Sequence, residues 1–295
     1  MNARTETTER DHMNHEHVPV GEGNVGSGAA PPTSLRGLAA VGCVFRTNAR
    51  GSLRGRRGIV LLLLVFLPTI LILISDILGT ERGGGSYFFM ENIVPVFHYI
   101  ELVIYIFLGC SVLGDAIEDR TLTYDLICPV SRGSLFAGRY LTYIVSSLLL
   151  LVPAVVAVHL VCMARYGLDD VRFNLPLLWA VLAATVLGAL VYGAAFLFLS
   201  LLTKRAVLVA IILAICVEGF VANLPLRVST CSMLYHLRNV MVAVSGKVEF
   251  FPAHGMAIYQ EMDPVALTHS VVVLAVTWLA FLVASLLLFQ RKQFP

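Results

Sequence analysis

The sequence is poor in charged residues. Of its 295 residues only 14% are Asp, Glu, Lys or Arg, whereas 58% are hydrophobic, and the mean hydropathy is +0.82. A soluble globular domain carries roughly 45–50% apolar residues. The composition therefore excludes a soluble domain and predicts an all-α integral membrane protein.

Paired cysteines are also missing. The six cysteines form no Cys-x-x-Cys pair, and only Cys231 falls in a predicted outer loop. A disulfide framework or a zinc site is therefore not expected. His12, His15 and His17 could bind a transition metal, but nothing in the sequence around them fixes a ligand geometry, so we favour a solvated tail and expect no metal.

Common catalytic motifs are absent as well. The sequence contains no GxxxxGK[ST], no HExxH and no GxSxG motif. Residues 133–139 reproduce the glycine spacing of a phosphate-binding loop but lack its Lys and its Ser or Thr. We therefore expect that the chain is not an enzyme, cannot hydrolyse ATP itself and holds no cofactor of its own.

What the sequence has instead is a series of apolar segments. Each is close to the ~20 residues that an α-helix needs to cross ~30 Å of hydrocarbon. We predict six spans, at about residues 58–75, 93–114, 141–163, 177–202, 206–224 and 270–290. Only residues 203–205 separate the fourth span from the fifth, which indicates a tight hairpin. The outer insert at residues 225–269 is expected to form short helices, since backbone near the bilayer must be helical or covered.

Lysine and arginine indicate the orientation. With both termini inside, the inner segments from Ser34 onward contain thirteen of these residues and the outer segments six. Cytoplasmic segments of membrane proteins are enriched in Lys and Arg. We therefore predict an N-in, C-in topology in which residues 291–295 form a cytosolic tail.

Two segments precede the first span. Residues 1–33 are polar and rich in Gly and Pro, which predicts a disordered cytosolic tail. Residues 34–57 separate into an apolar and a basic face at 100° per residue. The two faces are Leu38, Val41 and Phe45, and Arg36, Arg46 and Arg50. This pattern predicts an amphipathic helix in the membrane interface; nucleic-acid binding is disfavoured because a span follows at once.

The longest polar insert on the inner side is residues 115–140, between the second and third spans. Leu122 and Leu126 share one helical face at i,i+4, and the acidic pair Glu118-Asp119 precedes them. Pro129 ends this helix because it lacks an N–H. The pattern predicts a short amphipathic helix that is presented to the cytosol for docking.

The motifs in this insert resemble the cytosolic loop of ABC-2-type transporter permeases. The resemblance rests on EDRTLTY at 118–124, PVSR at 129–132 and GRYL at 138–141. With the six-span topology, it extends over nearly everything after about Ser34. The sequence departs from the family pattern at Asp125 and Cys128, and Arg139 replaces the usual Lys.

The resemblance implies the permease subunit of an ATP-driven transporter in the plasma (inner) membrane, with export as the favoured direction. A separate ABC ATPase subunit would bind ATP and Mg²⁺, and a second permease copy or paralogue would complete the pathway. Membrane lipid is the other expected partner. The residues implied in ATPase docking are Glu118, Asp119, Thr121, Leu122, Leu126, Pro129 and Arg132.

Ionisable residues inside the spans are candidates for a substrate path, because burying a charge in lipid costs about 2.5–3.5 kcal/mol or more. His98 and Glu101 lie on one face of the second span at i,i+3, and Glu218 lies near the outer end of the fifth. For Glu218 a structural pairing, with a neighbour such as Arg227, is an equal alternative. Two other functions stay open: a membrane-embedded enzyme that uses these residues with His159, and a secondary transporter.

Overall fold

The structure is a computed structural model. It describes residues 39–42, 44–46, 56–77, 94–118, 131–164, 174–221, 230–246 and 265–292. Within these ranges the chain forms helices and no strand, which confirms the all-α prediction. The predicted tail at residues 1–33 and the predicted docking helix around Leu122 and Leu126 lie outside the described residues.

Four helices are long and apolar enough to cross a membrane, which supports the prediction of a helical membrane protein. They comprise Val96–Ile117, Arg132–Val161, Leu175–Leu202 and Leu267–Arg291. Two further apolar helices, at Gly58–Ile74 and Ala206–Phe220, are shorter. These two coincide with the predicted first and fifth spans, so six spans remain a prediction.

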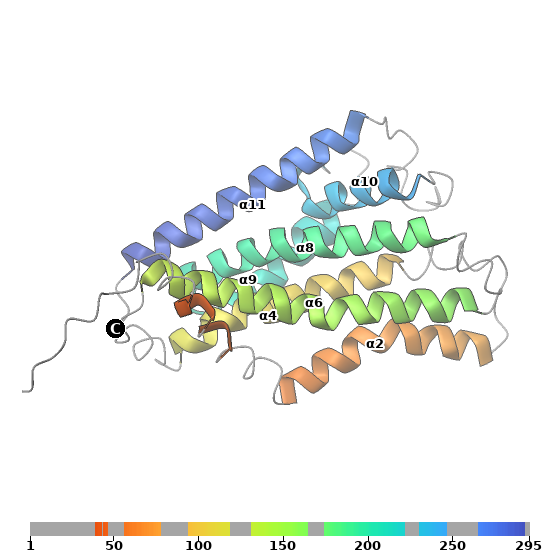
Figure 1. The fold of residues 1–295 in the computed structure, drawn as a ribbon, viewed down its shortest axis with the longest axis horizontal. Helices are drawn as coiled ribbons and strands as arrows, with labels where there is room; N and C mark the ends of the chain where they lie inside the picture. Colours follow the sequence, from red (N-terminus) through yellow and green to blue (C-terminus); the bar gives the residue numbers. More distant parts are fainter. Residues whose placement is uncertain are drawn as a thin grey trace, which may run out of the picture. The chain divides into compact units, whose positions relative to one another are not determined.

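The helices follow one another along the chain with the following bounds. They are α2 (Arg56–Ile77), α4 (Val94–Glu118), α6 (Arg132–Ala164), α8 (Leu175–Leu202), α9 (Ala206–Leu213), the π-helix η2 (Ala214–Phe220), α10 (Met233–Ser245) and α11 (Val265–Arg291). Within the unit that spans residues 33–295, Figure 1 shows α8 between the pair α4 and α6 and the pair α10 and α11.

The central position of α8 follows from its small residues and its backbone. It contacts α4, α6, α9, α10 and α11. A Cβ atom at Gly188 would lie 3.3 Å from the Tyr105 ring, so the glycine lets α4 approach closely. The carbonyl of Thr185 accepts a hydrogen bond from the Tyr105 hydroxyl at 2.8 Å, and that of Leu190 accepts one from the Tyr140 hydroxyl at 3.0 Å. The two tyrosines therefore anchor α4 and α6 to α8.

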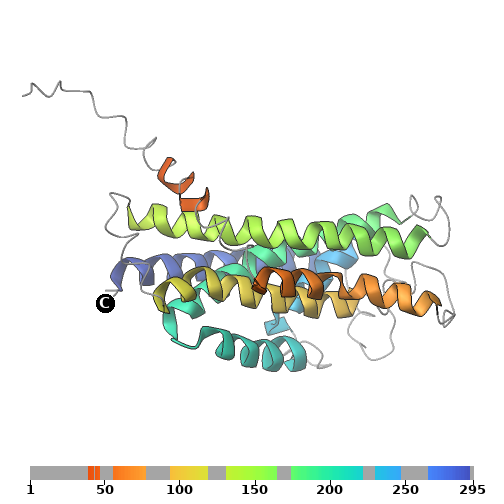
Figure 2. The ribbon, with the colours of Figure 1, turned by 90° about the horizontal axis from the view of Figure 1, so that it is seen from below.

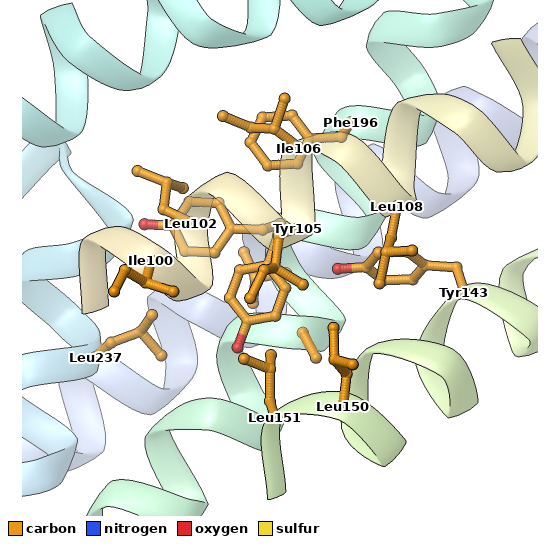
Figure 3. Close-up of a cluster of buried hydrophobic side chains, with 14 of the residues drawn as sticks. Ile100, Leu102, Tyr105, Ile106, Leu108, Tyr143, Leu150, Leu151, Phe196 and Leu237 are labelled. Carbon is orange, nitrogen blue, oxygen red and sulfur yellow. The ribbon is translucent and has the colours of Figure 1, made fainter. Parts of the chain in front are cut away.

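The hydrophobic core lies where these helices meet. Figure 3 shows side chains of α4, α6, α8 and α10 converging in a buried cluster that includes Tyr105 and Tyr143. Figure 2 shows α6 and α9 on opposite sides of α4, and α4 contacts both. Through these contacts α4 is buried on several sides, which places its polar side chains inside the bundle.

The third predicted span begins earlier than the sequence pattern indicates. The sequence predicts a polar insert up to residue 140 and a span from about residue 141, but α6 starts at Arg132. Its first turn is capped by Ser131, whose hydroxyl oxygen accepts the N–H of Ser134 at 3.1 Å. Phe136 is buried and lies 5.8 Å from the ring of Phe289 on α11. Apolar contact with α11 thus stabilises a helical conformation in a segment that carries several polar residues.

The insert at residues 225–269, which was predicted to form short helices, contains the helix α10. Ser232 caps its first turn by accepting the N–H of Tyr235 at 3.3 Å, and Gly246 ends it in the left-handed conformation with a φ of 64°. Its residues are mostly buried against α8 and α11. This helix therefore packs against the bundle.

Candidate functional site

The flanks of the predicted docking loop are the last residues of α4 and the first turns of α6. α4 ends at Glu118 and α6 begins at Arg132. Between them, the predicted docking residues Asp119, Thr121, Leu122, Leu126 and Pro129 lie outside the described residues. The described residues of this region are therefore the two helices that flank the loop, and both belong to the bundle.

Arg132 is engaged within the chain. Its exposed side chain donates to the carbonyl oxygens of Gln290 at 2.8 Å and Lys292 at 3.5 Å. These carbonyls belong to the C-terminal end of α11, where backbone oxygens have no intrahelical donor. A cation at a helix C-terminus also interacts favourably with the helix dipole. Arg132 therefore ties the start of α6 to the end of α11.

The segment Gly138-Arg139-Tyr140 connects α6 to three other parts of the chain. A Cβ atom at Gly138 would lie 2.9 Å from Val44, so the glycine accommodates the short helix formed by residues 39–42 and 44–46. Arg139 donates to the carbonyl of Val112 on α4 at 2.6 Å. The hydroxyl of Tyr140 accepts the indole N–H of Trp278 on α11 at 2.7 Å. In this chain the family-like motif is thus a packing junction.

The three predicted path residues are all buried. His98 and Glu101 on α4 are 4% exposed and Glu218 on η2 is 5% exposed. Glu101 and Glu218 both act electrostatically on Tyr192 of α8, as does Arg238 of α10. The structure therefore places two of the predicted residues, Glu101 and Glu218, near Tyr192 of α8.

Glu101 contacts a neighbouring helix, whereas His98 forms a hydrogen bond within its own helix. The carboxyl oxygen Oε1 of Glu101 lies 2.5 Å from the hydroxyl oxygen of Thr185 on α8. His98 uses Nδ1 to bond the carbonyl of Val94 in its own helix at 2.8 Å. A carbonyl oxygen only accepts, so Nδ1 carries the hydrogen and Nε2 of the neutral ring is an acceptor.

Glu218 lies at the N-terminal end of α10. Its carboxylate accepts the backbone N–H of Met233 at 3.1 Å and of Leu234 at 3.0 Å, and it accepts the hydroxyl of Ser232. The two N–H groups are the first backbone donors of α10, which have no intrahelical acceptor. A negative charge at a helix N-terminus is also favoured by the helix dipole. Glu218 therefore binds the N-terminal end of α10; the alternative neighbour Arg227 lies outside the described residues.

A second polar contact ties α10 to α11. The hydroxyl oxygen of Ser270 lies 3.2 Å from Nδ1 of His236 and accepts the amide of Asn239 at 3.1 Å. The other ring nitrogen of His236 donates to the carbonyl of Thr230 at 2.9 Å. Burial lowers the pKa of His236, and the nearby His269 lowers it further. The neutral imidazole therefore suits this contact, because its Nδ1 can accept the serine hydroxyl.

Several residues of this region carry no signal in the sequence that marks them as part of a site. Thr185 and Tyr192 belong to an apolar span and gave no signal of their own. Arg238 was counted as an outer-loop cation, yet it is buried. Its helix, α10, is buried along most of its length, which the local sequence pattern did not indicate. His159, considered for the enzyme alternative, is buried on α6. The described residues contain no group of three potential metal ligands.

No protein-family model matches the chain, and no curated protein matches it.

Proposed function

We propose that this chain is the membrane-spanning permease subunit of an ATP-driven ABC-2-type transporter, with export as the favoured direction. The observation that carries the proposal is the run of motifs from 118 to 141, EDRTLTY, PVSR and GRYL, which lies between two apolar helices. A separate ATPase subunit docks on this loop and supplies ATP and Mg²⁺. A second permease copy or paralogue completes the substrate pathway.

The contacts at the flanks of the loop support this function. A docking loop transmits force only if its flanking helices are coupled to the rest of the membrane domain. The Arg139 contact with Val112 joins α6 to α4, and the Arg132 contacts join α6 to α11. Displacement of the loop would therefore move three helices together, which is the rigid-body motion that alternating access requires.

The proposed topology has six spans with both termini in the cytosol of a plasma-membrane protein. In it, α2 and the pair α9–η2 join the four longer helices as spans. The tight turn of residues 203–205, which follows α8 directly, fits an inner hairpin that carries Lys204 and Arg205. Both side chains are exposed, as the cytosolic ends of spans require.

The function is tested by purifying the tagged chain from its native membrane and assaying ATP hydrolysis. The proposal predicts a stoichiometric ATPase subunit and vanadate-sensitive hydrolysis in the eluate. The control is the same purification from a strain that carries Leu122→Asp and Leu126→Asp together. Hydrolysis that is equal in both eluates, or absent from an intact wild-type preparation, contradicts the proposal.

A further inference from the structure

The hydroxyl of Thr185 contacts two oxygens but has one hydrogen to donate. Its Oγ1 lies 2.5 Å from Oε1 of Glu101 and 2.9 Å from the carbonyl oxygen of Val181. Both distances are those of hydrogen bonds. A carbonyl oxygen carries no hydrogen, so the Thr185 hydroxyl has to donate to Val181. The hydrogen between Thr185 and Glu101 then belongs to the carboxyl group.

The surroundings of Glu101 also favour a neutral carboxyl group. The side chain is 4% exposed, and the described residues contribute no ion-pair partner to it. An unpaired carboxylate in an apolar interior is strongly disfavoured relative to the protonated acid. Glu218 provides the contrast, because two backbone N–H groups and a hydroxyl stabilise its negative charge.

His98 supplies a vacant acceptor beside this acid. Its Nδ1–H is committed to Val94, and its Nε2 is buried with no hydrogen-bond partner among the described residues. A buried polar atom without a partner is uncommon and calls for an explanation. His98 and Glu101 are three residues apart on one helix, so their Cβ atoms lie about 5–6 Å apart. An acid that holds a proton and a base with a free lone pair are therefore neighbours.

We propose that Glu101 and His98 form a proton-binding pair inside the helical bundle. In the resting state the proton is bound to Glu101, whose carboxyl group donates a hydrogen bond to the Thr185 hydroxyl oxygen. The His98 ring is neutral in this state. Transfer of that proton to Nε2 would leave a carboxylate and an imidazolium, so the pair holds one proton in either state. The site needs no ATPase partner and does not rest on the proposed transport function.

Other titratable groups lie near the pair. Tyr105 on α4 itself and Tyr192 on α8 interact electrostatically with Glu101, and a third nearby group is Arg238 on α10. Tyr143 on α6 and Glu218 on η2 act on Tyr105 and on Tyr192, respectively. α9 contains no titratable side chain. Arg238 acts electrostatically on His98. A positive charge there opposes an imidazolium, which agrees with a proton that rests on Glu101.

Infrared difference spectroscopy of the full-length protein in lipid tests the pair. The carbonyl stretch of a protonated carboxyl group is separate from that of a carboxylate. At neutral pH we expect such a band in the wild type, sensitive to exchange into D₂O, and its loss in Glu101→Gln. The amide of this variant can still donate a hydrogen bond to Thr185, so this contact between α4 and α8 is kept. A band that persists in Glu101→Gln, or no protonated band in the wild type, overturns the proposal.

Two variants with Glu101 intact keep the test valid if Glu101→Gln does not fold. Thr185→Val removes the acceptor, so the carboxyl band should move to higher frequency; Thr185→Ser keeps the hydroxyl and should leave the band in place. A band that is unmoved in Thr185→Val shows that the protonated acid is elsewhere and overturns the assignment.

A third variant, His98→Asn, should leave the band present at neutral pH, since Glu101 holds the proton in the resting state. Loss of the band in this variant would contradict the pair.

Discussion

The ring of Tyr143 on α6 occupies the space in which Gly193 of α8 would carry a side chain. A Cβ atom at Gly193 would lie 2.0 Å from Cε1 of Tyr143. The ring is fully buried, and Tyr140 stacks on it with ring centroids 6.3 Å apart. The approach of α6 to α8 therefore depends on the absence of one methyl group.

Gly193→Ala should destabilise the protein, because the Tyr143 ring has to move or the two helices have to separate. Overpacking of this kind costs about 1–3 kcal/mol. Gly114→Ala on α4 is the matched control, since a Cβ atom there would meet nothing within 4 Å. We expect the control to be neutral or stabilising by up to ~1 kcal/mol, as alanine favours helix over glycine. Thermal unfolding in detergent measures both, and equal midpoints for the two variants would refute the packing account.

Glu218→Gln should mainly lower thermal stability. The amide keeps one oxygen as an acceptor but loses the negative charge at the N-terminus of α10, and its NH₂ group faces backbone donors. Leaving a buried donor without an acceptor costs about 1–3 kcal/mol. Unfolding of the purified variant gives the size of this loss. A variant as stable as wild type, with altered transport or ATPase stimulation, would instead place Glu218 in the substrate path.

Acidification should weaken the contact between α10 and α11 through His236. Burial lowers the pKa of this imidazole in the folded protein, so the folded state favours the neutral ring. Above the ordinary histidine pKa of about 6.5 both folded and unfolded chains are neutral and the contact is at full strength. As the pH falls below that value, the unfolded chain binds a proton first and stability decreases. Unfolding midpoints from about pH 8 to about pH 5 should drop more in wild type than in His236→Asn; parallel profiles would exclude this role.

The proposed topology is tested with two positions that the structure describes as exposed. In a background without other cysteines, the native Cys231 should react with an impermeant maleimide on intact cells. Ser131→Cys, just before α6, should react only after permeabilisation. Both positions reacting from the outside would rule out the N-in, six-span arrangement.

The apolar runs predict the helices well, because length and hydropathy are properties of a single segment. The fourth predicted span, 177–202, agrees closely with α8, Leu175–Leu202. The residues from Arg132 to Tyr140, which precede the predicted third span, are also helical; their contacts with α11 and α4 stabilise the helix there, and no local pattern contains such contacts. The spacing of His98 and Glu101 predicts that they share one helical face. It does not predict the contact of Glu101 with Thr185, which lies 84 residues further along the chain.

The contacts of Glu218 could not be predicted from the sequence for the same reason. Its pairing depends on α10 folding back so that Ser232, Met233 and Leu234 reach it, 14 to 16 residues further along. Helical periodicity predicts neighbours three or four residues apart, and it does not predict where a connecting segment returns. The contrast between a capped acid at 218 and a neutral acid at 101 could therefore come only from the assembled bundle.

The central claim, that an ATPase docks on the loop between α4 and α6, is tested most directly by the amount of ATPase that co-purifies with loop variants. Burying one leucine is worth roughly 1.5–3 kcal/mol, so Leu122→Asp or Leu126→Asp should abolish co-purification while the permease inserts and unfolds normally. Ser131→Asp is the matched control: it adds the same charge nearby, and aspartate also caps a helix, so the ATPase should remain bound. Reversal of Glu118 and Asp119 to lysine should give a milder, salt-sensitive loss. Wild-type amounts of ATPase with both leucine variants would contradict the account.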